Sequence, residues 1–257
     1  MTPPNATASP PALSIDGAVA RIELARPEQH NAIEAGDTER IRAHLAEVDA
    51  DPAVRVLVMS GQGQTFCAGA SLREIESGAM TGALFETLTD GLAAVRVPTI
   101  CALNGSVYGG GTELALCCDF RIGVLGSRMS VPAARLGLCY PLAGLRRYVE
   151  ALGLGVASRL LLASEELDAD EMLAVGFLHL LVPREELDAA TATLAARLAS
   201  LAPLAVQGMK RILRAIARGD VDLEEAKRIV AACAASEDLR EGLSARRERR
   251  PPEFRGG

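Results

Sequence analysis

Aromatic residues are scarce in this sequence of 257 residues, which has no tryptophan, three tyrosines and five phenylalanines. Hydrophobic residues nevertheless make up 49% of the chain, so the core must be packed almost entirely by alanine, leucine, valine and isoleucine. Together with a charged fraction of 23%, this composition excludes a chain that is disordered throughout. The length is sufficient for one large domain or two small ones.

Positive charge is also in short supply, since 27 lysines and arginines stand against 33 aspartates and glutamates and give a formal net charge of −6. This balance argues against nonspecific binding to nucleic acid and against a basic membrane-surface protein. No stretch approaches the roughly 18 apolar residues of a membrane-spanning helix, and the first residues lack the basic and apolar regions of a secretory signal. We therefore expect a cytoplasmic protein with neither a nucleic-acid nor a membrane partner.

Patterns typical of disulfides and metal sites are missing as well. The six cysteines include no C-x-x-C pair, and Cys117 and Cys118 are adjacent within an apolar run. In a chain of this length, such spacing predicts reduced cysteines that act as small hydrophobic residues. The three histidines form no pair at helical spacing, so we expect no metal site.

Nucleotide-binding fingerprints are absent too. Gly61 and Gly63 follow an apolar segment that predicts a strand, but Phe66 occupies the place of the third glycine in a dinucleotide-binding turn. The sequence also contains no phosphate-binding loop of the G-x-x-x-x-G-K-[S/T] type. These two classes of nucleotide-binding protein are therefore excluded.

What the sequence does contain is a repeated succession of strand and helix patterns. Alternating or β-branched apolar residues predict strands at 18–25, 54–59, 98–103 and 119–124. Helical patterns lie between them, at 37–51, at 81–96 and in the apolar stretch that ends at Cys117, and they dominate from about residue 142. Residues 1–12 are rich in proline and are expected to be disordered. The succession predicts an α/β core followed by a helical C-terminal region.

The most informative segment is a run of three glycines, Gly109–Gly111, between a predicted strand and a predicted helix. Glycine allows positive φ angles and lets the backbone approach a ligand closely. The first N–H groups of the following helix have no partner within the helix and can stabilise a developing oxyanion. Glu113 follows one turn along this helix, so its carboxylate could move a proton at a carbon next to a carbonyl. Alternatively, the glycines form only a tight turn and Glu113 only stabilises the helix dipole.

A second glycine-bearing loop, Phe66–Leu72 (FCAGASL), also ends a predicted strand and begins a helical segment. The two loops could each offer one backbone N–H to the same oxygen. Two such donors form an oxyanion hole, and the loss of one donor costs roughly 10²–10³ in rate. The second loop therefore favours the catalytic interpretation of Glu113.

Taken in order, these segments resemble the enoyl-CoA hydratase/isomerase (crotonase) family. The resemblance runs from about residue 13 to 256, and the segments that carry it are Leu24–Ala32, Phe66–Leu72, Asn104–Asp119, Ala202–Lys210, Ser236–Asp238, Glu241-Gly242 and Arg250–Phe254. It implies a crotonase-like spiral of β-β-α units, with a disordered extension at 1–12, an α/β core at 13–195 and a helical trimerisation region at 196–257. It also implies an acyl-CoA thioester as substrate, no metal, no cofactor apart from the coenzyme A of the substrate, and a homotrimer or a dimer of trimers.

Site residues follow from the same resemblance, position by position. Ala68 and Gly110 match the two backbone donors of the oxyanion hole, and Glu113 matches the first of two hydratase glutamates, which handle the water and the α-carbon proton. The acyl-CoA is expected to bind in a bent conformation, partly covered by the C-terminal helices of a neighbouring copy. The positions that correspond to substrate or CoA contacts are Ala32, Ala70, Ser71, Leu72, Phe254 and Arg255.

One departure from the family pattern bears on the reaction. Ala133 stands where hydratases have their second glutamate, and alanine can neither accept nor donate a proton. The segment that follows, Leu136–Gly144, resembles methylmalonyl-CoA decarboxylases, which have a tyrosine at the position of Tyr140, and Arg135 could meet a substrate carboxylate. Tyr140 is therefore a candidate catalytic residue beside Glu113; alternatively, its ring only packs in the core. Three readings stay open: a hydratase or isomerase, a decarboxylase-like or other variant enzyme, and an acyl-CoA-binding homologue without catalysis.

Overall fold

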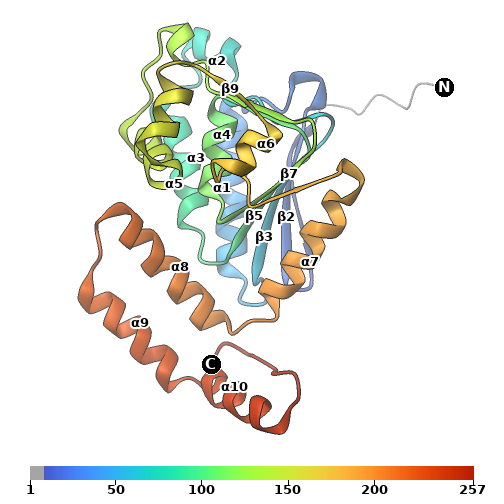
Figure 1. Ribbon diagram of the computed structural model, residues 1–257, viewed down its shortest axis with the longest axis vertical. Helices are drawn as coiled ribbons and strands as arrows, with labels where there is room; N and C mark the ends of the chain where they lie inside the picture. The colour runs from blue at the N-terminus through green and yellow to red at the C-terminus, as the bar shows by residue number, and fades with distance from the viewer. Residues whose placement is uncertain (1–8) are drawn as a thin grey trace, which may run out of the picture.

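A six-stranded sheet forms the centre of the molecule (Figure 1). The computed structural model describes residues 9–257, so the disorder expected for residues 1–8 lies outside the described part. The strand order is β1-β2-β3-β5-β7-β10; β1 and β2 are antiparallel, and all other neighbours are parallel. The strands are β1 Ser9–Asp16, β2 Val19–Ala25, β3 Val56–Gly61, β5 Thr99–Leu103, β7 Phe120–Val124 and β10 Leu180–Val182. The four predicted strands are thus confirmed.

Strand β1 corrects the expectation that residues 9–12 are disordered. It pairs with β2, and its register is irregular only between Ser9 and Ala12, where Pro10 and Pro11 interrupt the ladder. Proline is tolerated here because β1 is an edge strand, on which part of the backbone needs no partner. These four residues therefore belong to the sheet.

A second sheet carries the two glycine loops. Its strands, in the order β4-β6-β8-β9, are β4 Thr65–Cys67, β6 Ser106–Tyr108, β8 Arg128–Ser130 and β9 Glu166–Asp168. Strand β4 leads into the loop that begins at Ala68, and β6 leads into the glycine run. Because β4 and β6 are parallel neighbours, both loops leave the same edge of the sheet.

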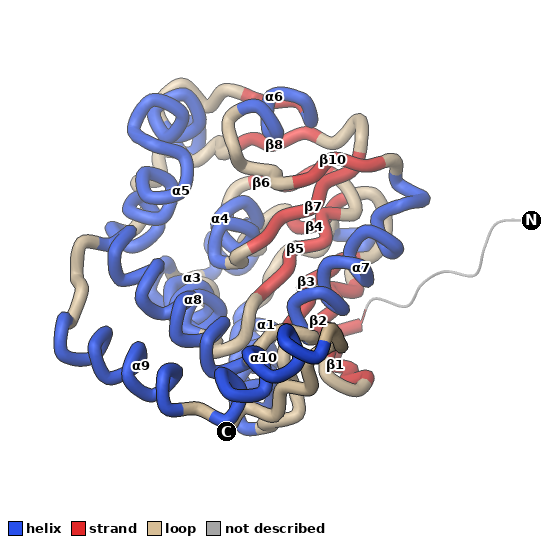
Figure 2. Tube along the Cα trace, turned by 60° about the horizontal axis from the view of Figure 1, so that its bottom comes forward, coloured by secondary structure: helices blue, strands red, loops and turns tan. Residues whose placement is uncertain are grey.

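Alternate residues of the central strands face opposite layers, as a strand period of two requires. In β3, Leu57 and Met59 face the larger core, whereas Val56 and Val58 face a smaller one. The larger core is closed mainly by α1 (Ala35–Ala50), α3 (Gly82–Ala94), α4 (Gly110–Cys117) and α5 (Leu142–Leu161). Helix α7 (Leu187–Ala199) covers the smaller core on the other face of the sheet (Figures 1 and 2). The shorter helical segments are α2 Leu72–Ser77, α6 Ala169–Ala174, η1 Pro27–Gln29, η2 Ala134–Leu136 and η3 Arg184–Glu186.

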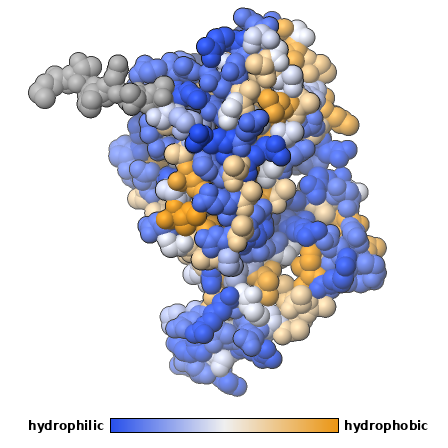
Figure 3. Space-filling model, turned by 180° about the vertical axis from the view of Figure 1, so that it is seen from behind, coloured by the Kyte–Doolittle hydropathy of each residue, from blue (hydrophilic) through white to orange (hydrophobic). Residues whose placement is uncertain are grey.

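Three C-terminal helices form an arm at the opposite end of the molecule from α2 (Figure 1). They are α8 Pro203–Arg218, α9 Leu223–Ala235 and α10 Glu237–Glu248. The boundary expected at residue 196 falls within α7, which packs on the sheet, so the arm itself begins at α8. Several large apolar side chains of the arm are exposed, and Figure 3 shows apolar atoms at this end of a largely hydrophilic surface.

The described residues, 9–257, contain free cysteines, no cluster of metal ligands and no single membrane-spanning helix. All six cysteines are free, and Cys67, Cys101, Cys117 and Cys118 are buried like small hydrophobic residues, whereas Cys139 is exposed. Within this described range, no three histidine, cysteine or acidic side chains cluster as metal ligands would. No single described helix is long and apolar enough to cross a membrane; one pair, Arg184–Ala199 with Pro203–Arg218, passes by length and composition but is bent by 105°.

Candidate active site

The two glycine loops meet where β4 and β6 end. Gly69 has a φ of 86° and Gly109 a φ of 51°, both in the left-handed region that glycine adopts readily. A Cβ atom on Gly69 would lie 2.5 Å from the Gly110 amide nitrogen, and one on Gly111 would lie 2.3 Å from the Cys67 carbonyl oxygen. No side chain fits between the loops, so their close approach requires glycine.

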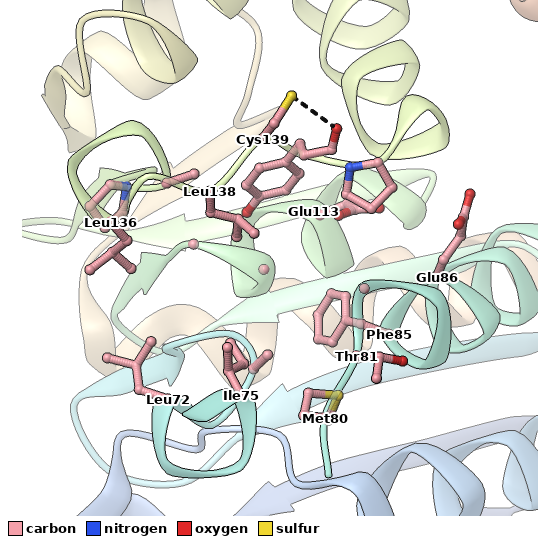
Figure 4. A pocket seen from close by; sticks show the side chains of 18 of the residues that line it. Leu72, Ile75, Met80, Thr81, Phe85, Glu86, Glu113, Leu136, Leu138 and Cys139 are labelled. Atoms are coloured by element: carbon pink, nitrogen blue, oxygen red, sulfur yellow. Dashed lines mark hydrogen bonds between the residues drawn. The ribbon is translucent and has the colours of Figure 1, made fainter. Parts of the chain in front are cut away.

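A cavity of about 250 Å³ opens beside these loops (Figure 4). Leu72 and Ile75 of α2 line one side of it, and Leu136 and Leu138 of the segment before α5 line another. Most of the lining is apolar, and the described residues that line the cavity include no lysine, arginine or histidine. Other lining residues are Ala68, Ala70, Met80, Phe85, Glu86, Gly110, Glu113, Ala133, Cys139 and Tyr140. The cavity is therefore suited to an apolar group with a few polar contacts.

One of the two expected backbone donors, Ala68, is replaced by another residue, and the other, Gly110, stays a candidate. The Ala68 amide already donates to the His30 carbonyl oxygen at 2.9 Å, which corrects its assignment as an oxyanion donor. Two residues further on, Ala70 forms an isolated bridge with Ile33, and its own amide has no acceptor among residues 9–257. The Gly110 amide opens α4 and likewise has no acceptor in the described part of the chain. Ala70 and Gly110 both line the cavity, so their amides are the candidate donors.

Glu113 lies on α4 at the cavity wall and is only 3% exposed. Arg147 of α5 donates from Nη1 to its Oε1 at 2.6 Å. Burial raises the pKa of the Glu113 carboxyl above its ordinary value, and Arg147 opposes this change without reversing it. A carboxyl group with a raised pKa exchanges a proton near neutral pH more readily than an exposed glutamate does.

Tyr140 lines the same cavity and packs edge-on against Tyr148 of α5, with ring centres 5.8 Å apart and ring planes at 90°. Burial, and then the neighbouring Glu113 carboxylate, raise the pKa of the Tyr140 hydroxyl. The hydroxyl therefore stays protonated at neutral pH and can donate a hydrogen bond. The two expected catalytic side chains are thus brought to one cavity.

Ala133 also lines the cavity, so a methyl group occupies the position of the second hydratase glutamate. Glu86 of α3 is the other carboxylate among the lining residues, and Figure 4 shows it on the α3 side. It is half-buried, in contrast to Glu113. No pattern in the sequence indicated that Glu86 would share the cavity.

The expected CoA-binding residues near the cavity come from two adjacent loops. The Ser71 amide donates to the Ile33 carbonyl oxygen at 2.9 Å, which holds the loop that contains Ala32 against the segment from Ala70 to Leu72. Leu72 lines the cavity and is 56% exposed. This part of the expected binding surface is contiguous.

The other two expected contacts, Phe254 and Arg255, lie in the segment that follows α10. The Phe254 carbonyl oxygen accepts from Arg55 Nη2 at 2.6 Å, and the Arg255 amide donates to Asp238 Oδ1 at 2.8 Å. Neither residue lines the cavity of its own chain. The Arg255 guanidinium is largely exposed, with 86% of its side chain accessible.

Two residues of α5 that touch Glu113 were missed from the sequence. Besides Arg147, Gly144 lies so close that a Cβ atom there would be 3.1 Å from Glu113 Oε2. Gly144, Arg147 and Tyr148 are spaced at i, i+3 and i+4, which places them on one helix face. This spacing was the available signal, but it could not reveal that the face packs against Glu113.

Comparison with known proteins gives a consistent result. A family model described as enoyl-CoA hydratase/isomerase matches residues 14–257. The chain is 34% identical over 245 residues to a Mycobacterium leprae protein named "Probable enoyl-CoA hydratase echA6", which covers 93% of this chain and 96% of that protein. It is 33% identical over 248 residues to a crotonyl-CoA hydratase of Syntrophomonas wolfei, which covers 92% and 94%. A solved enoyl-CoA hydratase/carnithine racemase structure from Magnetospirillum magneticum superposes with a TM-score of 0.91 at 27% identity and covers 97% and 96%.

Proposed function

Because this chain belongs to the enoyl-CoA hydratase/isomerase family, we propose that it adds water to the 2,3-double bond of an enoyl-CoA thioester, with Glu113 as its acid/base. The observation that carries the proposal is the position of Glu113, which is buried at the wall of the cavity that also contains the free Ala70 and Gly110 amides. The similarity to a crotonyl-CoA hydratase supports hydration as the reaction.

In this proposal, the Ala70 and Gly110 amides hold the thioester carbonyl oxygen. Negative charge develops on that oxygen as an enolate forms, and two fixed N–H donors stabilise it without having to reorganise. Gly110 is the first residue of α4, so the positive end of the helix dipole lies at the same point.

A single carboxylate can complete the proton transfers of hydration. The water oxygen bonds to C3 while ionised Glu113 accepts a proton from the water, and the π electrons move toward C2 and the carbonyl oxygen. Glu113 then gives that proton to C2, and the enolate electrons form the new C–H bond. The carboxylate ends ionised, so alanine at position 133 is compatible with the reaction.

We assign Tyr140 the role of a hydrogen-bond donor in the cavity. Its hydroxyl remains protonated because burial raises its pKa, so it can donate to the attacking water but cannot replace Glu113 as the base. The role is subordinate: loss of this hydroxyl should lower the rate less than loss of the Glu113 carboxylate.

The lining of the cavity favours an uncharged acyl group. Glu86 and Glu113 would repel a substrate carboxylate, and no basic side chain among the described lining residues offsets them. Arg135, which could have met such a carboxylate, donates from Nη2 to the Ser164 carbonyl oxygen at 3.0 Å and does not line the cavity. This arrangement disfavours a methylmalonyl-CoA decarboxylase-like reaction, despite the shared tyrosine.

We further propose that the chain forms a homotrimer or a dimer of trimers in the cytoplasm. Exposed apolar residues of the C-terminal arm supply a surface for self-association, and Phe254 and Arg255 would reach the CoA bound by a neighbouring copy. Six free cysteines fit a reducing compartment. The proposed reaction needs no metal and no cofactor besides the coenzyme A of the substrate.

Hydration of crotonyl-CoA tests the proposed reaction. We expect turnover by the wild type and a decrease of about 10²–10⁴-fold in kcat for Glu113→Gln, because the amide cannot carry the proton. The decrease for Tyr140→Phe should be smaller. Arg135→Gln is the control, since Arg135 lies outside the cavity, and it should retain wild-type kcat.

Butyryl-CoA and methylmalonyl-CoA distinguish the proposed hydratase from a decarboxylase-like enzyme and from a homologue that binds acyl-CoA without catalysis. In D₂O, the wild type should exchange the C2 proton of butyryl-CoA, and Glu113→Gln should not. Decarboxylation of methylmalonyl-CoA without hydration of crotonyl-CoA would support the decarboxylase-like reaction instead. Binding of every thioester with turnover of none would contradict catalysis by this site.

A further inference from the structure

Arg147 contacts the proposed acid/base, Glu113. It lies on α5, with 13% of its side chain exposed. Its Nη1 donates to Glu113 Oε1 at 2.6 Å and to Thr89 Oγ1 at 3.0 Å, and its Nη2 forms an ion pair with Asp90. One guanidinium therefore joins α4, which carries Glu113, to two consecutive residues of α3.

The two oxygens of Glu113 have different surroundings. Oε1 is held by Arg147, whereas Oε2 lies next to Gly144, which has no side chain to cover it. A hydrogen bond from the Thr89 side chain also favours the ionised form of the carboxyl. The carboxylate thus has one oxygen, Oε1, fixed by a cation, and a second oxygen, Oε2, on which no cation is placed in the described part of the chain.

We propose that Arg147 is a positioning residue that keeps Glu113 ionised and confines proton transfer to Oε2. The inference rests on the proposed function of Glu113 as the acid/base. A carboxylate this deeply buried and without a cation would take up a proton, and it could then not act as a base toward water. The planar guanidinium also fixes the carboxylate orientation, which a flexible ammonium group does less well.

Among residues 9–257, Arg147 is the cation that acts on Glu113. Asp90, the other ionic partner of Arg147, is 59% exposed, and a negative charge near a carboxylate disfavours its ionisation. The remaining groups that face Glu113 are Tyr148 of α5, Tyr140 before α5, Glu86 of α3 and Cys117 of α4. Substitutions of Arg147 and Asp90 should therefore move the pKa of Glu113 in opposite directions.

The test is to follow Glu113 directly, by ¹³C NMR of carboxyl-labelled glutamate, with Glu113→Gln used to assign the signal. In Arg147→Gln, we expect the pKa of Glu113 to rise by at least about 1 pH unit, and Arg147→Lys should restore part of this change. In Asp90→Asn, the pKa should fall by about 0.3 pH unit, because the removed charge is exposed.

The acid limb of kcat/KM for crotonyl-CoA should shift in the same order as the NMR titration. If the substitutions shift the pKa of Glu113 measured by NMR but leave the acid limb of kcat/KM unchanged, the inference about Arg147 holds. Glu113 is then not the base of the reaction. If Arg147→Gln is folded by circular dichroism and leaves the titration of Glu113 unchanged, the inference is overturned. An upward shift in Asp90→Asn would overturn it as well.

Discussion

At Gly144, the absence of a side chain leaves room for the Glu113 carboxylate. A Cβ atom would lie 3.0 Å from Tyr140 Cδ1 and 3.1 Å from Glu113 Oε2, closer than an ordinary van der Waals contact. The backbone is helical, so alanine fits it and improves helix propensity by about 1 kcal/mol. We predict that Gly144→Ala keeps or raises the melting temperature but lowers kcat for crotonyl-CoA about tenfold or more, because the carboxylate must move.

Gly155 provides a control in the part of α5 that follows Gly153, where the backbone (φ 75°, ψ 162°) departs from helical geometry. A Cβ atom there would meet nothing within 4 Å, so Gly155→Ala should change stability in the same direction and leave kcat unchanged. Melting temperatures and kcat values of the two variants, measured side by side, show whether the loss of kcat in Gly144→Ala comes from displacement of the Glu113 carboxylate. Equal losses of kcat in both variants would mean that α5 is sensitive to alanine for reasons unrelated to Glu113.

The candidate site was only partly predictable from individual residues. The glycine run and its following glutamate could be recognised because close backbone approach and proton transfer each demand a particular residue type. The oxyanion donor was assigned to Ala68 rather than Ala70, because the direction of each N–H depends on backbone angles such as the φ of 86° at Gly69. The role of Arg147 was invisible for a related reason, since it depends on which helix faces Glu113.

At the scale of elements, Asp119 attaches α8 to the core. Its carboxylate lies 2.8 Å from Lys210 Nζ and 2.7 Å from Arg214 Nη2, and it accepts from the Thr99 amide at 2.8 Å. We predict that Asp119→Asn destabilises the protein by about 3 kcal/mol in urea denaturation at pH 7, because two largely buried cations lose their counter-ion. Asp220→Asn, which disrupts the exposed pair with Arg218, should cost less than about 1 kcal/mol.

The ion pairs of Asp119 also predict how the stability of the protein depends on pH. Burial raises the pKa of Asp119, but Lys210 and Arg214 outweigh burial and hold that pKa below its ordinary value. The stabilisation is therefore complete above the unfolded pKa, about 4, and is lost as pH falls through the lower folded value. The difference in unfolding free energy between wild type and Asp119→Asn should shrink below about pH 4. A constant difference from pH 7 to pH 3 would contradict this account.

The elements themselves were predictable in proportion to their length. Strands of five residues or more, such as β3 and β5, carry enough apolar pattern to be recognised. The three-residue strands β4, β6 and β8 carry too little pattern, yet β4 and β6 are the strands that lead into the two glycine loops. Strand β1 was missed because its prolines suggested disorder, and only its edge position makes them acceptable.

At the scale of the whole molecule, the C-terminal arm presents an apolar stripe that none of residues 9–257 covers. On α8, Met209, Leu213 and Ile216 are 57%, 64% and 58% exposed, and their spacing of i, i+4 and i+7 places them on one face. Exposed apolar residues gathered in this way are typical of interfaces between proteins. Phe254 and Arg255 do not line the cavity of their own chain. In the proposed assembly, they would instead contact the CoA bound by a neighbouring copy.

We therefore predict that Leu213→Arg converts the assembled protein to a monomer, since a charge at the centre of the stripe cannot be buried without a partner. Light scattering after size-exclusion chromatography measures this directly, and circular dichroism checks that the variant is folded. Leu125→Arg is the control, because Leu125 is similarly exposed, at 57%, but lies in the turn after β7, outside the arm.

If Phe254 and Arg255 bind the CoA of a neighbouring copy, the Leu213→Arg monomer should show a raised KM for crotonyl-CoA. Arg255→Ala should likewise raise KM, but without changing the assembly. A wild-type protein that is monomeric at micromolar concentration with full activity would rule out both the assembly and the shared site.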